Sequence, residues 1–256
     1  MTPGAPRISP NMMPRRTSSV PPASAMPKRR HAFSAAVPQR GWPNSTVFAD
    51  TGILLSAGRK RDCVPKFTGH YADRLCVAEN VAMEIARIAA PGAGRWADGR
   101  AHTAAAVAKT SILDAGRCYV DTNEYDSRVF DEVLLKLQNL PKKGEEQHHE
   151  FAHLGEAASI ALCVLRIAEG RKVVFLVNDG GASLVASQHG VPARHFGHVL
   201  SELACAGHYT SEEAFDVFAY ATAVSGVPVD AAPKGAKDLE CRRSSGSCGI
   251  CDSLVG

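Results

Sequence analysis

The segment KVVFLV at residues 172–177 constrains the fold of this chain more than any other. After its lysine it is an unbroken apolar run, without the alternation of polar and apolar residues that marks a strand with one face in water. A strand of this kind is covered on both faces, as in the centre of a parallel sheet with helices on either side. The segment therefore indicates an α/β protein.

Shorter strand-like and helix-like segments alternate along the rest of the chain. β-Branched and aromatic residues predict strands at 46–49, 75–78, 117–121 and 191–197. Apolar periodicity, capping residues and Ala-rich composition predict helices at 51–62, 81–90, 95–116, 127–140, 155–169, 182–190, 198–207 and 211–226. Gly58 and the basic run after it are expected to close the first helix, and Asn80 to cap the second. The alternation predicts a three-layer α/β/α domain with a central, mainly parallel sheet.

The two ends of the chain differ in composition from its middle. Residues 1–42 contain eight prolines, seven Lys or Arg residues and no acid, and they lack apolar periodicity. We expect them to form a disordered basic tail, which either attracts phosphate or anionic membrane surfaces or only aids solubility. Residues 43–226 are expected to form the folded domain, and residues 227–256 a flexible C-terminal tail.

Hydropathy and cysteine usage both favour the cytoplasm. No stretch of 18 apolar residues is present, so no membrane association by a spanning helix is expected, and no apolar segment of an export signal follows the N-terminal arginines. An organellar address stays open, because the leader also has transit-peptide composition. The first five cysteines stand singly in apolar or mixed segments, which indicates reduced, buried thiols. The last three form Cys-x6-Cys-x2-Cys from Cys241, for which zinc or redox chemistry is a less favoured alternative.

Two aspartates follow directly on predicted strands. Asp50 ends TVFAD and Asp179 ends VVFLVND, and the carboxyl ends of parallel strands meet at one edge of a sheet. In such sheets ligands bind beyond that edge, at the place where the strand order reverses. The two side chains are therefore expected to lie close together. The alternative is that each aspartate only caps the helix that follows it.

Two glutamates are candidates for the same site. Glu84 lies on the stripe formed by Val81 and Ile85, where an ionised carboxylate needs a partner or a metal unless it turns to solvent. Glu156 opens the helix that follows a polar loop, and this places it at one end of the domain. The alternative for Glu156 is that it only stabilises the positive end of the helix dipole.

Four segments around these acids resemble the motifs of the PIN-domain family, which includes VapC-type toxins and housekeeping relatives. They are FADTGILLSA, VAENVAMEIARI, HLGEAASIALC and FLVNDGGASLVASQHGV, and the resemblance spans residues 46–222. It implies an endoribonuclease in which the four acids hold one or two Mg2+ or Mn2+ ions. Hard divalent cations prefer oxygen ligands, so a sparse set of carboxylates suits them. The metal activates water and stabilises the in-line displacement at phosphorus.

The resemblance also assigns supporting roles and shows two departures. Thr51 is similar to the hydroxyl residue beside the family's first aspartate, and Asn178 stands at another polar position; both are expected to orient water or phosphate. Val177 replaces the usual Thr or Ser two residues before the last acid, and Ser183 stands where many relatives carry Arg. These departures bear on substrate contacts more than on the metal ligands.

Other motifs in the chain are weaker. Asp50-Thr51-Gly52 spells the aspartic-protease signature, but those enzymes are all-β. The segment from Asp121 imitates an EF-hand loop except at its sixth position, where Asp126 replaces the required glycine, and both aspartates are better explained as helix caps. His148, His149 and His153 lack the order of a zinc helix, and phosphate contact by one of them is a minor alternative.

Two functions therefore remain. The first is a metal-dependent endoribonuclease, either housekeeping or the toxin of a toxin–antitoxin pair, with RNA as substrate, an antitoxin-like protein as partner and a homodimer as its assembly. The second is a catalytically silent nucleic-acid-binding or interaction module that kept the fold. The second would bind RNA with strong salt dependence and leave it intact.

Overall fold

The computed structural model describes residues 45–93, 99–140, 153–222 and 232–240, all within the compact unit Phe33–Gly256. The expected basic tail at residues 1–42 lies outside the described residues. The strands are β1 (Ser45–Ala49), β2 (Leu75–Ala78), β3 (Tyr119–Asp121), β4 (Lys172–Leu176) and β5 (Ala193–Arg194). They form a five-stranded sheet in the order β3-β2-β1-β4-β5, and each pairing is parallel.

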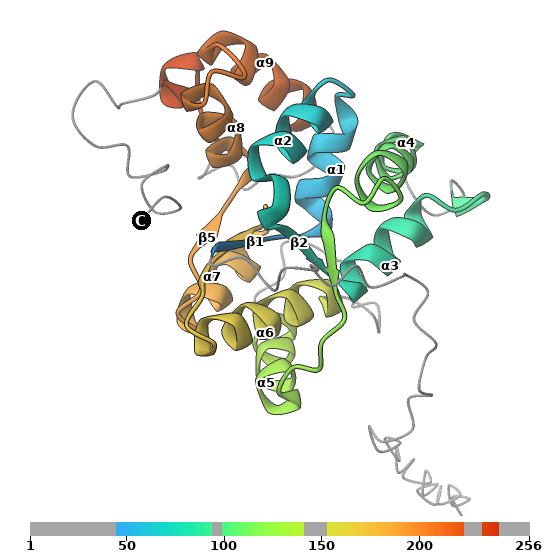
Figure 1. Cartoon of the computed structure of the whole chain (residues 1–256), viewed down its shortest axis with the longest axis vertical. Helices are drawn as coiled ribbons and strands as arrows, with labels where there is room; N and C mark the ends of the chain where they lie inside the picture. The colour runs from blue at the N-terminus through green and yellow to red at the C-terminus, as the bar shows by residue number, and fades with distance from the viewer. Residues whose placement is uncertain (1–44, 94–98, 141–152, 223–231, 241–256) are drawn as a thin grey trace, which may run out of the picture. The chain divides into compact units, whose positions relative to one another are not determined.

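Helices connect the strands and cover the sheet (Figure 1). The α-helices are α1 (Thr51–Arg59), α2 (Cys63–Tyr71), α3 (Glu79–Ile88), α4 (Gly99–Ala108), α5 (Ser127–Gln138), α6 (Leu154–Ala168), α7 (Gly180–Gln188), α8 (Phe196–Cys205) and α9 (Ser211–Thr222). Shorter helices are the 3-10 helices η2 (Ala72–Arg74) and η6 (Ala236–Leu239) and the π-helix η4 (Lys109–Leu113). None of the described helices is long and apolar enough to cross a bilayer.

The helices form two layers around the sheet. The helices α1, α2, α4, α8 and α9 lie on one side, and α5, α6 and α7 lie on the other (Figure 1). Helix α3 contacts α4 in one layer and α6 in the other, so it connects the two helical layers. The predicted three-layer α/β/α fold with a parallel sheet is confirmed.

The strand order reverses beside β1. The chain passes from β1 to β2 and β3 on one side, and then returns to place β4 on the other side of β1. The β1–β4 pair runs in register from Ser45 opposite Lys172 to Ala49 opposite Leu176. The carboxyl ends of β1 and β4 are thus the switch point at which open parallel sheets bind ligands.

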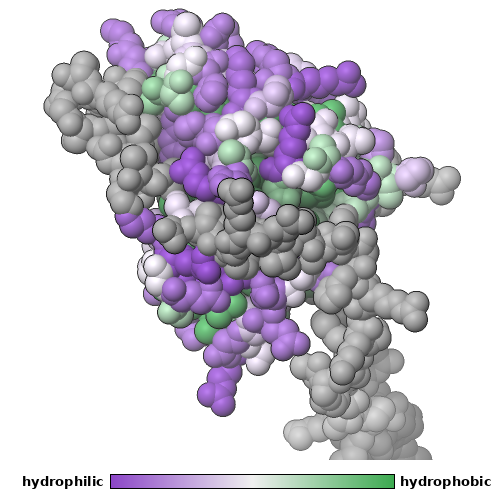
Figure 2. Space-filling model, in the orientation of Figure 1, coloured by the Kyte–Doolittle hydropathy of each residue, from purple (hydrophilic) through white to green (hydrophobic). Residues whose placement is uncertain are grey.

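The apolar segment at residues 173–177 lies in the centre of the core. Val173, Val174, Phe175 and Leu176 of β4 are buried, as a strand with helices on both faces requires. The surface drawn in Figure 2 is mainly hydrophilic. Large apolar side chains that stay exposed in the described part are Leu135, Ile167, Leu184 and Tyr220.

Helix α1 ends at Arg59, in the basic run and one residue beyond Gly58, but this glycine has a further role. It lies inside α1, where a Cβ atom would collide with the backbone carbonyl of Ala104 in α4. The glycine is therefore a point of close approach between two helices, which is a different use of its missing side chain. Helix α2, which the sequence pattern did not predict, then follows as a separate element.

Two further expectations are corrected. Asn80 lies in the first turn of α3, whose N-cap is Ala78, so it does not begin the helix. Within the expected C-terminal tail, residues 232–240 are packed rather than free, since η6 contacts α8 and α9 and Leu239 is 1% exposed. The Cys-x6-Cys-x2-Cys segment lies outside the described residues.

Candidate active site

Asp50 and Asp179 lie at the carboxyl ends of the two strands that flank the switch point. The backbone N–H of Asp50 donates to Leu176 O of β4 at 3.0 Å, which extends the β1–β4 ladder to the aspartate. Asp50 caps α1, with Oδ2 accepting from Gly52 N at 3.3 Å. Asp179 caps α7, with Oδ1 accepting from Ala182 N at 2.7 Å. The capping interpretation is confirmed for both, and each carboxylate keeps further lone pairs for other partners.

Glu84 points from α3 toward the first turn of α1. Its Oε2 accepts a 2.7 Å hydrogen bond from the Thr51 hydroxyl. Gly155 of α6 lies against the same carboxylate, because a Cβ on that glycine would sit 3.3 Å from Glu84 Oε2. Glu84 is thus partly buried between three helices, and Thr51 holds its orientation.

The charges of three carboxylates act on one another. Burial raises the pKa of Asp50 well above its ordinary value, and the charges of Glu156 and Glu84 raise it further, while the N–H groups of Thr51 and Gly52 oppose them. Burial likewise raises the pKa of Glu84, with a further contribution from Glu156, against the Thr51 hydrogen bond and Arg87. Asp50 is only 6% exposed, so water screens this repulsion weakly.

His153 connects the remaining acid to this group. Its Nδ1 lies 3.8 Å from Glu156 Oε2, and the neighbouring carboxylates of Glu156 and Asp179 raise the pKa of His153 against the effect of burial. The residue caps α6 with a left-handed backbone, at φ 66°. The charges of Asp50, Glu84 and Glu156 therefore act on one another, and Asp179 is linked to this group through its charge effect on His153.

Asn178 has a different position from the one expected. Its amide nitrogen donates to Gly52 O at 3.3 Å and Ser56 Oγ at 3.1 Å, and its Oδ1 accepts from Phe196 N at 3.0 Å. These bonds tie the end of β4 to the first turns of α1 and α8. The amide therefore fixes helix positions and has its donors occupied by protein groups, so it does not orient water or phosphate through them.

The structure separates the competing motifs from this site. Asp121 is buried and paired with Arg166 at 2.6 Å, so it is part of a core ion pair and caps no helix. Asp126 caps α5 as expected, with Oδ1 accepting from Arg128 N at 2.8 Å. The parallel α/β sheet excludes an aspartic protease, which is all-β. His148 and His149 lie outside the described residues.

The donor set fits a hard divalent cation by its chemistry. Among the described residues, neither Asp50 nor Glu84 forms a salt bridge with Lys or Arg; the charge of Arg87 acts on Glu84 alone. The same residues contain no group of three or more His, Cys, Asp or Glu side chains already arranged to hold a metal ion. The charges of the carboxylates thus act on one another, but their side chains are not arranged as a metal coordination sphere.

Sequence reasoning missed the residues that shape the site without a charge of their own. Gly155 makes room for Glu84, and Gly181 makes room for Leu140, which follows α5 and whose Cδ1 would collide with a Cβ atom there. A glycine next to an acid in the first turn of a helix is the signal that points to Gly155. Ser56 carries no such signal, because its contact with Asn178 depends on the sheet order.

Comparison with known proteins adds no assignment. The chain matches no protein-family model, no curated protein and no solved structure. The PIN-domain resemblance therefore stays a prediction that rests on the motifs in the sequence.

Proposed function

We propose that this chain is a metal-dependent endoribonuclease that hydrolyses RNA phosphodiester bonds at the switch point of its sheet. The proposed metal ligands are Asp50, Glu84, Glu156 and Asp179. The observation that carries the proposal is the burial of Asp50 beside two further carboxylates, Glu156 and Glu84, with no Lys or Arg salt-bridge partner for Asp50 among the described residues; burial first, and then these two charges, raise its pKa. Buried like charges of this kind are costly, and they concentrate at functional sites.

The chain's own residues have definable tasks in this reaction. The N–H of Gly52 and the hydroxyl of Thr51 hold Asp50 and Glu84 in fixed orientations, which keeps ligand oxygens available at one place. His153 supplies a polar group beside Glu156 at the border of the site. A bound Mg2+ or Mn2+ supplies the activation of water and the neutralisation of phosphate charge.

Cleavage of a mixed RNA pool by the purified full chain in Mn2+ tests the proposal. We expect Asp50→Asn to lower the rate by roughly 100-fold or more, since loss of a ligand exceeds the effect of losing its outer-shell support. An asparagine keeps an oxygen for the Gly52 N–H, so the cap of α1 is retained. Asp126→Asn is the matched control, because it makes the same change at another helix cap that lies outside the site.

Full activity of Asp50→Asn, or of the wild type in excess EDTA, would contradict the proposal. The catalytically silent module is the second candidate, favoured by the lack of a preformed group of three metal-binding side chains in the described residues. A silent module would retain RNA in a filter-binding assay, release it as salt rises, and leave it uncleaved with every divalent ion tried.

The proposed setting is the cytoplasm. Cys63, Cys76, Cys118 and Cys163 are buried and free, as in proteins of reducing compartments. An antitoxin-like partner and a homodimer stay predictions of the family resemblance. Co-purification of the chain with the product of a neighbouring open reading frame, followed by its effect on RNA cleavage, distinguishes a toxin from a housekeeping enzyme.

A further inference from the structure

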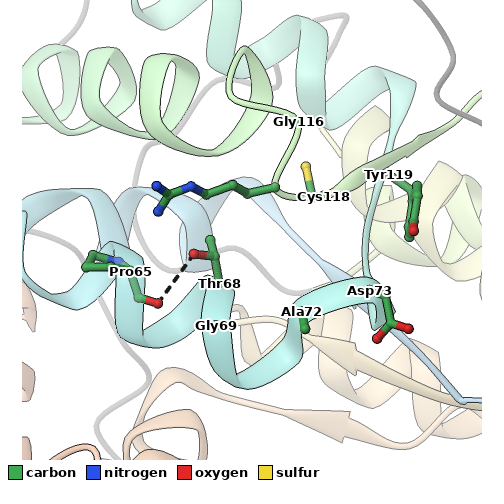
Figure 3. A pocket seen from close by; sticks show the side chains of 9 residues that line it. Pro65, Thr68, Gly69, Ala72, Asp73, Gly116, Cys118 and Tyr119 are labelled. Carbon is green, nitrogen blue, oxygen red and sulfur yellow. Dashed lines mark hydrogen bonds between the residues drawn. The ribbon is translucent and has the colours of Figure 1, made fainter.

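A second concave site lies at the opposite edge of the sheet. A cleft of about 380 Å3 opens where β2 and β3 begin, lined by Pro65, Thr68, Gly69, Ala72, Asp73, Gly116, Arg117, Cys118 and Tyr119 (Figure 3). Its volume is in the range of small-molecule sites, roughly 300–1,000 Å3. The carboxylates lie beyond the other ends of the strands, and a strand as long as β1 spans roughly 16 Å. The cleft is therefore separate from the proposed metal site.

Two opposite charges line this cleft without neutralising each other. Asp73 of η2 and Arg117, just before β3, are both exposed. Neither forms a salt bridge with any residue in the described ranges. A carboxylate and a guanidinium held apart on one cleft can each pair with the opposite charge of a single small molecule.

The backbone on one wall is held in an unusual conformation. Ala72 has φ 38° and ψ −120°, a strained region for a residue with a side chain, and its N–H donates to Thr68 O. Gly116 on the other wall has φ 64°, which glycine adopts without strain. Strained residues of this kind persist where the surrounding structure enforces them, and they concentrate at ligand-holding segments. This observation is independent of the charges and points to the same cleft.

The lining between the charges is neutral. Pro65 and Thr68 lie on one side and Tyr119 on the other, with Cys118 between them (Figure 3). Burial raises the pKa of the Cys118 thiol to about 12, so it stays protonated and is no nucleophile at neutral pH. The Thr68 hydroxyl donates to Val64 O at 2.9 Å, which leaves its oxygen as an acceptor. Binding here is non-covalent.

The charge pattern selects among ligand classes. The carboxylate of Asp73 makes one part of the cleft negative, which disfavours a polyanion such as a nucleotide. Arg117 correspondingly disfavours a simple polyamine. A molecule with one charge of each sign and an apolar group meets all three parts of the lining.

We propose that this cleft binds a small zwitterion of the amino-acid or dipeptide class, with its carboxylate at Arg117 and its ammonium at Asp73. The apolar side chain of the ligand packs on the ring of Tyr119. This site does not depend on the proposed ribonuclease activity, because its ligand, its edge of the sheet and its readout are different.

Titration of the 15N-labelled full chain with phenylalanine and with phenylalanylglycine tests the proposal. We expect saturable shifts of the amides that line the cleft. N-Acetylphenylalanine lacks the ammonium and phenylalaninamide lacks the carboxylate, and each is expected to bind about fivefold more weakly, the effect of one exposed ion pair. Asp73→Asn should remove the preference for the ammonium, and Arg117→Gln the preference for the carboxylate.

A filled cleft provides the sharpest control. A Cβ atom at Gly69 meets no heavy atom within 4 Å, so Gly69→Phe adds a ring at the cleft without a clash at the backbone. Gly99→Phe at the start of α4 has equally open surroundings and leaves the cleft unchanged. Loss of binding in the first variant only, with both melting cooperatively, supports the site. No saturable shift with either ligand, or equal binding by Gly69→Phe, overturns it.

Discussion

Two opposing effects act on the pKa of Asp50. Two backbone N–H groups favour its charged form, while burial and the charges of Glu156 and Glu84 favour the neutral acid. A role as helix cap explains the two N–H hydrogen bonds. It does not explain the nearby charges of Glu156 and Glu84, because a cap needs no neighbouring carboxylates. The cost of the shared negative charge is removed by a proton at low pH or by a cation at neutral pH.

This balance predicts how stability depends on pH when no metal is added. Because the pKa values of Asp50 and Glu84 are raised in the folded chain, their contribution to stability is present at low pH and is lost as pH rises through the raised values. Asp50→Asn should therefore raise the free energy of unfolding by about 1 kcal/mol at pH 7 and bring no gain near pH 4.

Urea unfolding in EDTA at the two pH values measures this difference. Asp126→Asn, at the exposed cap of α5, should show no such dependence. Addition of Mn2+ to the wild type should reproduce the gain at pH 7 and have little effect on Asp50→Asn. A pH-independent difference between wild type and Asp50→Asn would mean that the carboxylates do not interact.

Gly155 offers a way to disturb the site without removing a charge. In Gly155→Ala the new Cβ would lie 3.3 Å from Glu84 Oε2 and 3.3 Å from Val81 Cγ2, so the carboxylate must shift. Alanine also favours the helix by roughly 0.5–1 kcal/mol, which offsets the crowding in stability. We expect Mn2+-dependent cleavage to fall about tenfold while the melting temperature changes little.

The matched change is Gly99→Ala, whose Cβ meets no heavy atom within 4 Å at the start of α4. It should keep both cleavage rate and stability. Unchanged cleavage by Gly155→Ala would show that the position of Glu84 has no bearing on the reaction.

At the scale of elements, the contact between α1 and α4 depends on a missing side chain. A methyl group at Gly58 would overlap the carbonyl group of Ala104, and backbone cannot rotate away as a side chain can. Gly58→Ala should therefore destabilise the fold by roughly 2 kcal/mol, although alanine is the better helix former. Gly69→Ala in α2, where the same atom meets open space, should instead be neutral or stabilising.

Chemical denaturation of both variants at one temperature checks the prediction. The two glycines lie in helices of the same length, nine residues each, so the intrinsic propensity effect is comparable. Equal stabilities would show that α1 and α4 separate without cost.

The strands and most helices follow from sequence patterns, because burial on both faces and apolar periodicity are local properties. Helix α2 does not follow, since CVPKFTGHY contains a proline and a glycine and its N-cap Asp62 makes no side-chain capping bond. Burial of Phe67 and Tyr71 fixes this helix, and burial depends on the tertiary structure. The close approach of Gly58 to Ala104 is unpredictable for the same reason, because Ala104 lies in another helix.

At the scale of the whole molecule, the sheet order decides which polar residues meet. Asp50 and Asp179 were predicted to share an edge because both end parallel strands, and Glu84 because it interrupts an apolar stripe. The position of Asp179 across His153 was not predictable, since it depends on a left-handed backbone at the start of α6. Asn178 was identified as a polar site residue, yet its bonds to α1 and α8 exist only in the assembled domain.

The β1–β4 pairing also determines when a site can exist during synthesis. Ser45 pairs with Lys172, so β1 has no partner on that side until most of the domain has left the ribosome. Every proposed ligand except Asp179 is translated before this ladder can close. A nascent chain therefore carries three of the four acids before the ladder can close, and the proposed nuclease site is incomplete until translation has passed β4.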